Sequence, residues 1–407
     1  MKRIHFYIFL ILIYLGCSKK QESYVLLISF DGFRSDYLDW YDTPNMDSFL
    51  KNGVRSEGLI PIFVSKTFPN HYSIATGQYA ENHGLIGNNF YDSKFHENYS
   101  LKDRSKVEDS KFYGGEPIWV TAEKQGVKSA SYFWVGSEAP INGIHPSIWK
   151  KYDHNFPFES RIDSIASWFS LPKHKRPRLC LLYFHEPDAI GHDTGPKSAE
   201  TATMVTKLDS LFGVLIKKLH STPIHTQLNI IVVSDHGMAE ISSDRTITLD
   251  DYTDMKNITQ EGSGPYTLLY SENEFDIKKT VKELNHAPNL KAYIKEEIPN
   301  RFHFKNHYRI KDILVLANEG WYINNQAISS SAKSGVYIPK GGTHGYDNQL
   351  KSMHALFIAK GPSFVSGEIV PPFENINIYP LICHILNINP SKNIDGNLKN
   401  VIDILQE

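Results

Sequence analysis

Three short apolar runs in this chain are each followed by a carboxylate. The runs are Tyr24–Phe30, Arg178–Phe184 and Leu228–Ser234. A continuous apolar run of this length is typical of a central strand in a parallel sheet, buried on both faces. Asp31, Asp188 and Asp235 follow the three runs, and Ala355–Ala359 has the character of a fourth strand. Since open α/β sheets bind ligands outside the carboxyl ends of their strands, we expect the functional site along that edge.

Segments with a helical spacing of apolar residues lie between these runs. They are Asn45–Asn52, Glu159–Phe169, Ser198–Leu219 and Ile376–Leu386. In Ser198–Leu219 the apolar residues recur every three or four positions, which is the stripe of a helix packed on a core. The alternation of helices with buried strands predicts an α/β fold with a doubly wound, mostly parallel central sheet.

The pattern changes to shorter elements between residues 250 and 340. These are the strand-like Tyr266–Tyr270 and Leu290–Ile294, the helical Asp276–Leu284, the piece Asp312–Tyr322 and a polar loop at 329–335. We predict a small α+β insertion of β-α-β type at 250–340, and a catalytic core made of 24–249 and 341–405. A length of 407 residues agrees with one large domain that carries an insertion.

Residues 1–17 have the pattern of an export signal. A basic start is followed by the apolar run Ile4–Leu15, which stops at Gly16 and Cys17. The run is too short to span a membrane as a mature helix. Residues 14–17 resemble a bacterial lipoprotein processing box, so we expect Cys17 to carry a lipid that anchors the exported protein to a membrane, at the periplasmic face or cell surface. The alternative is an ordinary secretory signal in which Cys17 has no role.

The charge balance limits the partners of this chain. Its 43 basic and 45 acidic residues give a formal charge of −2, which offers no global attraction for a nucleic acid duplex or an acidic membrane. An anion must therefore be captured by a local site. Cys180 and Cys383 lie in apolar runs, so we interpret them as small buried side chains and assign no disulfide.

The polar stretch Ser65–His71 contains a candidate nucleophile, Thr67. Pro69 suits the first turn of a helix, which we predict over residues 69–76. The unpaired N–H groups and the positive dipole end of that helix would lie beside the Thr67 hydroxyl and favour a phosphate there. Taken alone, Thr67 is better explained as the N-cap of the helix.

Acids and histidines near the strand ends form a candidate ligand set. They are Asp31, Asp188, His192, Asp235, His236 and, in a turn-like segment, His344. Such a mixed N/O set suits zinc, and it is enough for two ions if the Thr67 hydroxyl supplies a further ligand. Asp188 and His192 are four residues apart, so a helical turn or compact loop would direct both to one ion. Each residue alone is better explained as a cap, a turn residue or a hydrogen-bonded histidine, but six together favour a metal site.

Six motifs carry a family resemblance. They are Ile28–Arg34, Lys66–His71, Asn88–Asp92, Glu186–His192, Ser234–Met238 and Gly342–Gly345. In order and spacing they resemble the nucleotide pyrophosphatase/phosphodiesterase family of the alkaline phosphatase superfamily, from residue 24 to about 385. The resemblance implies a sheet of alkaline phosphatase type. It also implies cleavage of phosphodiester or pyrophosphate bonds of nucleotides, with release of nucleoside 5′-monophosphates.

The resemblance further implies a role for each ligand. One zinc ion would be held by Asp188, His192 and His344, and a second by Asp31, Asp235 and His236. Thr67 would bridge toward the second ion as the nucleophile, and Asn88 would donate to a phosphoryl oxygen together with the Thr67 backbone N–H. A divalent cation lowers the pKa of a threonine hydroxyl and favours the alkoxide. We therefore expect a covalent phospho-Thr67 intermediate that water resolves.

A substrate pocket is also implied. Phe68 and Tyr152 match positions at which nucleotide-cleaving members stack the base, and ordinary core packing is the alternative for both. Lys66, Trp134 and Glu138 match positions around the same pocket, where Glu138 replaces the more usual aspartate. The uncharged Asn88 favours a phosphodiester over a dianionic monoester.

Two other functions are compatible with parts of this pattern. One is a family member that cleaves choline phosphodiesters or lysophospholipids, although the sequence shows no clear cluster of acids around an aromatic cage. The other is a non-catalytic surface lipoprotein that captures nucleotides. The presence of Thr67 together with all six ligand positions argues against the second alternative.

Overall fold

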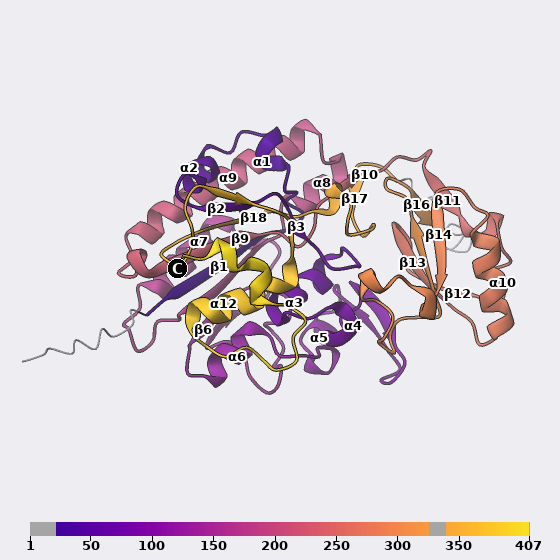
Figure 1. Cartoon of the computed structure of the whole chain (residues 1–407), viewed down its shortest axis with the longest axis horizontal. Helices are drawn as coiled ribbons and strands as arrows, with labels where there is room; N and C mark the ends of the chain where they lie inside the picture. Colours follow the sequence, from indigo (N-terminus) through magenta and orange to yellow (C-terminus); the bar gives the residue numbers. More distant parts are fainter. Residues whose placement is uncertain (1–21, 325–338, 407) are drawn as a thin grey trace, which may run out of the picture.

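The structure is a computed structural model that describes residues 22–324 and 339–406 (Figure 1). The expected signal segment with Cys17 and the expected loop at 329–335 lie outside the described residues. Within the described ranges, no helix has both the length and the apolar character needed to cross a membrane.

An eight-stranded sheet forms the centre of the larger part of the molecule. Its order is β19 (Glu368–Val370), β2 (Val54–Ser56), β18 (Phe357–Lys360), β9 (Leu228–Val233), β1 (Tyr24–Phe30), β8 (Leu179–Phe184), β6 (Ser129–Tyr132) and β7 (Ile148–Lys150). The strands from β9 to β7 are all parallel, whereas β18 is antiparallel to both β9 and β2. The predicted α/β class with a mostly parallel sheet is confirmed. The fourth predicted strand, however, runs against its neighbours and begins two residues later than expected.

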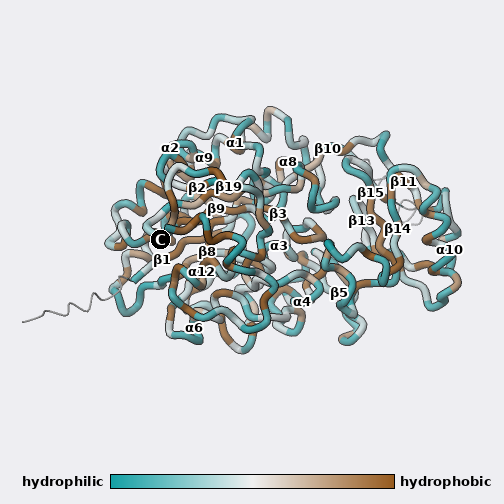
Figure 2. Tube along the Cα trace, viewed as in Figure 1, coloured by the Kyte–Doolittle hydropathy of each residue, from teal (hydrophilic) through white to brown (hydrophobic). Residues whose placement is uncertain are grey.

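Alternate side chains of β1 enter two separate cores. The main helices are α2 (Pro44–Leu50), α3 (Thr67–Thr76), α6 (Ile118–Lys124), α7 (Phe158–Phe169), α9 (Ala199–His220) and α12 (Ile378–Leu386). Val25 and Leu27 pack with residues of α3, α6 and α12, and Leu26 and Ile28 pack with residues of α7 and α9. Figure 2 shows the apolar strands enclosed between these layers. Because both faces are covered, the strand is apolar without alternation, as its sequence predicts.

The two cysteines of the described region lie in different cores. Cys180 belongs to the core on the α7–α9 side, and Cys383 belongs to the core on the α12 side. Both are buried and free, since the sheet separates them.

Helix α3 begins earlier than the sequence predicts. It starts at Thr67 rather than at Pro69, and the N-cap position is occupied by Lys66, which makes no side-chain cap. Thr67 is therefore not the N-cap, and its hydroxyl is left for other contacts. The helix ends at Gly77, whose φ of 66° lies in the left-handed region that glycine adopts without strain.

A second, antiparallel sheet lies within residues 250–340 and projects from the main sheet (Figure 1). Its order is β12 (Thr259–Glu261), β13 (Tyr266–Tyr270), β15 (Ile313–Ala317) and β14 (Leu290–Ile294). Helix α10 (Glu274–Leu284) connects β13 to β14, and β15 inserts between them. The predicted piece Asp312–Tyr322 is thus divided, because Tyr322 starts another strand, β16 (Tyr322–Asn324). The division of the chain into core and insertion at 250 and 340 stays a proposal.

Shorter elements complete the frame around the sheet edge. They include α1 (Tyr37–Trp40), β3 (Leu59–Ile60), α4 (Ala80–His83), β4 (Asn89–Asp92), β5 (Glu97–Ser100), α5 (Arg104–Val107), α8 (Asp188–Thr194), β10 (Ala239–Glu240), β11 (Thr246–Thr248), β17 (Gly342–Thr343) and β20 (Phe373–Glu374). β4 and β5 form a hairpin beside the second sheet. β10 pairs with β17, which carries the chain back from the second sheet to the main one.

Candidate active site

The carboxyl ends of β1, β8 and β9 meet at one edge of the sheet. Asp31 follows β1 directly, and Asp235 and His236 follow β9 within three residues. After β8 the chain turns and begins α8 at Asp188, whose backbone N–H donates to the Asp31 carbonyl. Because the three strands are parallel neighbours, all these side chains lie close together.

Two further elements bring in the remaining histidines. His192 is the fifth residue of α8, one turn after Asp188, as the spacing of four predicts. His344 follows β17, whose partner β10 begins three residues after His236. The pairing of β10 with β17 places His344 against His236, with ring centroids 3.4 Å apart.

The ligand atoms of this cluster are separated by distances that suit metal coordination. Asp188 Oδ1 lies 3.5 Å from His192 Nε2 and 3.6 Å from His344 Nε2. His236 Nε2 lies 3.5 Å from Asp31 Oδ1 and 2.9 Å from Asp235 Oδ2. Ligands about 2.0 to 2.1 Å from one tetrahedral zinc ion are themselves about 3.3 Å apart. The six predicted ligand residues are thus brought together by the structure.

The donor atoms fit divalent cations chemically. The Nδ1 atoms of His192, His236 and His344 bond to the carbonyls of Gly342, Gly237 and Ser65. This arrangement leaves each Nε2 lone pair directed into the cluster, as is usual for metal-bound histidines. Asp31 Oδ1, Asp188 Oδ1 and Asp235 Oδ2 are buried without a hydrogen-bond partner. A set of lone pairs facing one another without intervening protons is the arrangement that a cation stabilises.

The pKa shifts of the aspartates also indicate a cation site. Burial, together with the neighbouring Asp235 and Asp188, raises the pKa of Asp31 well above its usual value. Burial also acts to raise the pKa of Asp235, but His236 and His71 outweigh it and hold that pKa well below the usual value. Close carboxylates therefore repel one another in the ionised form, and a divalent cation would relieve that repulsion.

The groups of ligand residues that converge in the structure differ in one respect from the two sets that the resemblance implies. Asp188, His192 and His344 converge as the resemblance implies. Asp31 converges both with Asp188 and His236 and with His71 and Asp235, so Asp31 and Asp188 join the two halves of the cluster.

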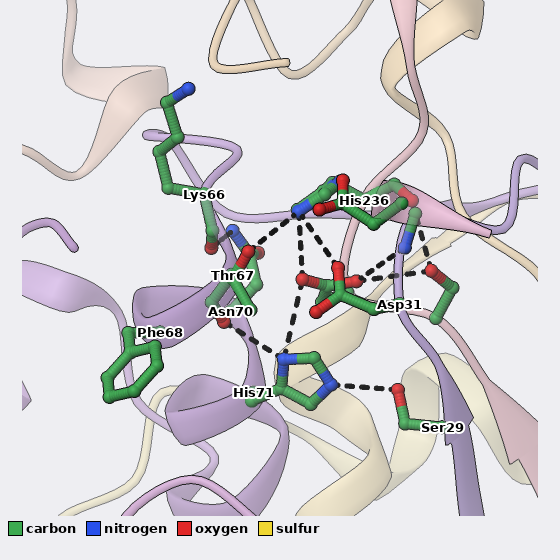
Figure 3. A network of polar contacts seen from close by, with 12 residues as sticks. Ser29, Asp31, Lys66, Thr67, Phe68, Asn70, His71 and His236 are labelled. Carbon is green, nitrogen blue, oxygen red and sulfur yellow. Dashed lines mark hydrogen bonds and ion pairs between the residues drawn. The ribbon is translucent and has the colours of Figure 1, made fainter. Parts of the chain in front are cut away.

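Thr67 lies against this cluster. Its Oγ is 3.2 Å from His236 Nε2, and Thr67 is the first residue of α3, so its hydroxyl lies at the positive end of the helix dipole (Figure 3). Asn70 anchors the segment before the helix, because its amide group donates to the carbonyls of Val64 and Lys66. The hydroxyl is thus held next to the candidate metal ligands.

His71 is a functional candidate that the sequence reasoning missed. It is fully buried, and its Nδ1 bonds to the Thr67 carbonyl at 3.0 Å and lies 3.4 Å from Asp235 Oδ2. Its Nε2 bonds to Ser29 Oγ at 2.8 Å, within strand β1 (Figure 3). The available signal was its position one helical turn after Thr67, but only the tertiary structure shows that it also reaches Asp235.

Asn88 lies beside the helix start, where the resemblance implies a phosphoryl contact. Its Oδ1 accepts a hydrogen bond of 2.9 Å from the Phe68 backbone N–H. The amide oxygen is therefore occupied, and the NH₂ group is the part of the side chain left to donate to a ligand.

A cavity of about 770 Å³ opens beside Thr67. Phe68, Trp134, Glu138 and Tyr152, the predicted pocket residues, all line it. Glu138 forms an ion pair with Arg104, whose guanidinium lies 5.7 Å from the Tyr152 ring centroid. The indole N–H of Trp134 donates to the His71 carbonyl, so this ring also supports helix α3.

Lys66 does not line this cavity. It precedes the helix in an extended conformation, with φ −122° and ψ 153°, and its side chain leaves on the opposite side of Thr67 from Phe68 (Figure 3). It lines a neighbouring cavity instead. Because Lys66 is extended and Thr67 begins the helix, Lys66 does not share a cavity with Trp134 and Glu138, and its role in substrate binding stays a prediction.

Comparison with known proteins places these features in a family. A sequence profile described as type I phosphodiesterase / nucleotide pyrophosphatase matches residues 25–347. A venom phosphodiesterase of Naja atra is 39% identical over 91% of this chain. The ectonucleotide pyrophosphatase/phosphodiesterase family member 3 of Rattus norvegicus is 38% identical over 91% of this chain. The chain spans about half the length of these relatives, 45% and 42% respectively.

Solved structures resemble the whole described fold. Murine ectonucleotide pyrophosphatase/phosphodiesterase 5, an inactive threonine-to-alanine variant in complex with AMP, matches with a TM-score of 0.87 and 37% identity. The match covers 95% of this chain and all of that chain. The human protein of the same name matches with the same TM-score and 36% identity.

Proposed function

Because the chain belongs to the type I phosphodiesterase / nucleotide pyrophosphatase family of the alkaline phosphatase superfamily, we propose that it is a two-zinc phosphodiesterase that releases nucleoside 5′-monophosphates. The observation that carries this proposal is the position of the Thr67 hydroxyl. It lies at the start of α3, 3.2 Å from Nε2 of His236, which is one of the six clustered ligand residues. The murine relative described as inactive carries a threonine-to-alanine change and binds AMP, which supports a threonine nucleophile and a nucleotide substrate.

The ligand residues have distinct roles in this proposal. Asp188, His192 and His344 would hold one zinc ion, and Asp31, Asp235 and His236 would hold the other near Thr67. The ions, when bound, lower the pKa of the threonine hydroxyl and neutralise charge on the phosphate. Thr67 attacks phosphorus, and the resulting phospho-threonine is hydrolysed by water. Asn88 and the helix start donate to the non-bridging oxygens, where negative charge develops.

The large cavity beside Thr67 supplies the nucleotide pocket. Phe68 and Tyr152 offer aromatic surface for a base, while Arg104 and Lys102 contribute positive charge near its wall. We therefore propose that a nucleoside binds in this cavity.

We further propose that the protein is exported and anchored to a membrane through a lipid on Cys17.

Hydrolysis of three nitrophenyl esters tests the reaction class. We expect p-nitrophenyl thymidine 5′-monophosphate to be cleaved at least about tenfold better, in kcat/KM, than p-nitrophenyl phosphorylcholine or p-nitrophenyl phosphate. The physical reason is that only the thymidine ester fills the aromatic cavity in the transition state. A preference for plain p-nitrophenyl phosphate would show a monoesterase, and a preference for the choline ester would show the lipid-type alternative.

His71 is expected to act as a positioning residue for both Thr67 and Asp235. His71→Ala should lower the affinity for added zinc and kcat by about 10- to 100-fold, with little change in KM, because second-layer partners of metal ligands have effects of that size. The matched control is His83→Ala. His83 is equally buried and bonds to α3 through Ser73, but it has no contact with the cluster. An equal loss of zinc affinity in both variants would indicate a general packing effect instead.

A further inference from the structure

An ion pair between Arg104 and Glu138 lies in the wall of the cavity of about 770 Å³ beside Thr67. Arg104 is the first residue of α5, and Glu138 lies in the turn that follows β6. Arg104 Nη2 donates a hydrogen bond to Glu138 Oε2. The carboxylate is buried, with its side chain 5% exposed, whereas the arginine side chain is 34% exposed. A charged donor and a charged acceptor therefore stand side by side at the cavity wall.

This ion pair has hydrogen-bonding capacity to spare. Arg104 Nε is buried and has no hydrogen-bond partner. Glu108 is the other acid near it, but Glu108 Oε1 lies 3.9 Å from Arg104 Nε and forms a closer ion pair, of 2.8 Å, with Lys151. Glu138 Oε1 accepts no hydrogen bond from any residue that the structure describes. Both members of the pair can therefore bond to a ligand as well as to each other.

The pair is placed to meet the edge of a stacked base. The guanidinium carbon of Arg104 lies 5.7 Å from the centre of the Tyr152 ring, and both residues line the same cavity as Glu138. A base that stacks on Tyr152 therefore has the guanidinium and the carboxylate beside its edge. Apart from Asp31 and Asp188 of the ligand set, Glu138 is the only carboxylate among the described residues that line this cavity.

We propose that Arg104 and Glu138 read the edge of the base, and that the protein prefers guanine nucleotides. The inference rests on the proposed function and specifies the base of its substrate. The carboxylate of Glu138 accepts hydrogen bonds from the N1–H and 2-amino groups of guanine. Arg104 donates to the guanine O6 and keeps its bond to Glu138, because a guanidinium has five N–H donors.

The other bases match the pair less well. Guanine carries two neighbouring donors, N1–H and the 2-amino group, next to the acceptor O6. Adenine and cytosine each carry one amine next to a ring-nitrogen acceptor, and uracil and thymine carry one N–H between two carbonyls. Each of these four bases leaves one oxygen of the Glu138 carboxylate without a donor. Since a buried acceptor without a partner weakens binding, guanine is favoured.

Two other polar side chains of the cavity do not oppose this preference. Lys102 lines the cavity as an exposed residue, and an ammonium group supplies only donors, which the amines of adenine and cytosine cannot use. The indole N–H of Trp134 already donates to the His71 carbonyl. The acceptor that the amine of a base requires is therefore supplied by Glu138.

Three nucleoside triphosphates with the same leaving group, GTP, ITP and ATP, test the base preference. We expect kcat/KM for GTP to exceed that for ATP by about tenfold or more, and ITP, which is GTP without the 2-amino group, to lie between them. Equal cleavage of GTP and ATP, or a preference for ATP, would overturn the inference while leaving the proposed function intact. If neither these compounds nor p-nitrophenyl thymidine 5′-monophosphate is cleaved, the proposed function itself fails.

A binding measurement tests the same preference without turnover. The zinc-loaded Thr67→Ala variant should bind GMP about tenfold more tightly than AMP in calorimetric titrations, because the two ligands differ only in the edge of the base. Equal affinities for GMP and AMP would show that the cavity does not read the base, and would contradict the inference.

Substitutions in the pair locate the effect. Glu138→Gln should lower the ratio of kcat/KM for GTP to that for ATP by about tenfold, because the amide replaces one acceptor with a donor. Arg104→Leu should also lower the ratio, since it removes the donor to O6. The matched control is Arg55→Leu. Arg55 forms an ion pair of 2.8 Å with Asp39 and does not line the cavity, so the ratio should be unchanged.

The ratio separates base recognition from folding. Each ratio compares two substrates on one variant, so a loss of folded protein lowers both rates equally and cancels. An unchanged ratio in both Glu138→Gln and Arg104→Leu would overturn the assignment of base recognition to this pair. A fall in the ratio of Arg55→Leu as large as that of Arg104→Leu would also overturn it, because the effect would then not depend on the cavity.

Discussion

The Thr67→Ala variant is expected to fold and to bind zinc, but to lose turnover by at least about three orders of magnitude. The loss follows because the hydroxyl forms the covalent bond to phosphorus, and removal of a nucleophile costs several decades in kcat. Folding should survive because Thr67 is not the cap of α3 and its hydroxyl bonds only toward the metal-type cluster, at His236. Initial rates on p-nitrophenyl thymidine 5′-monophosphate give the measurement.

Two companion measurements separate the chemical role of Thr67 from a structural one. Thr76→Ala is the matched control, because Thr76 is a buried threonine of the same helix whose hydroxyl donates to the Tyr72 carbonyl. It should retain activity within about threefold, since such a bond contributes modestly to stability. Acid quenching during turnover should place a phosphate on Thr67, detected by mass spectrometry of the peptide. Near-normal turnover of Thr67→Ala would defeat the assignment.

Metal removal is expected to abolish activity, and added zinc to restore it. The reason lies in the three orphaned carboxylate oxygens and three inward-facing histidine nitrogens at the sheet edge. Without a cation these groups repel one another, so the metal-free protein should also unfold at a lower temperature. Metal analysis of the dialysed protein should find two zinc ions per chain, and calorimetry with and without a chelator should show the shift in Tm.

Substitution of one ligand residue tests how many zinc ions the protein binds. His192→Gln should reduce zinc from two ions per chain to one, because His192 belongs only to the group with Asp188 and His344. Its side chain is 37% exposed, so the substitution should leave the fold intact. His174→Gln, in an exposed loop, is the matched control and should keep both ions. If the unsubstituted protein binds no zinc after incubation with excess zinc, the non-catalytic alternative would be revived.

Helix α3 shows the limit of prediction from sequence. Pro69 correctly marked the first turn of α3, yet the helix begins at Thr67. The difference changes the interpretation of Thr67, because a capping hydroxyl would bond to its own helix, whereas this one faces His236. Helix boundaries depend on contacts made outside the helix, here those of Asn70 with the preceding segment.

The character of the central strands was determined by the sequence alone. Tyr24–Phe30 is apolar at every position except Ser29, and such a nearly continuous apolar run is typical of a strand covered on both faces. The acids after β1, β8 and β9 could be assigned to one sheet edge for the same reason, since the carboxyl ends of parallel strands lie together. Local pattern was sufficient wherever burial and chain direction decided the structure.

Only the tertiary structure decided which side chains far apart in the sequence are in contact. His344 reaches the cluster through the pairing of β10 with β17, and His71 reaches Asp235 from helix α3 across to the end of β9. The two cavities on either side of Thr67 likewise depend on how the hairpin β4–β5 meets the second sheet. Such contacts join residues far apart in the chain, so no periodicity or spacing within one segment records them.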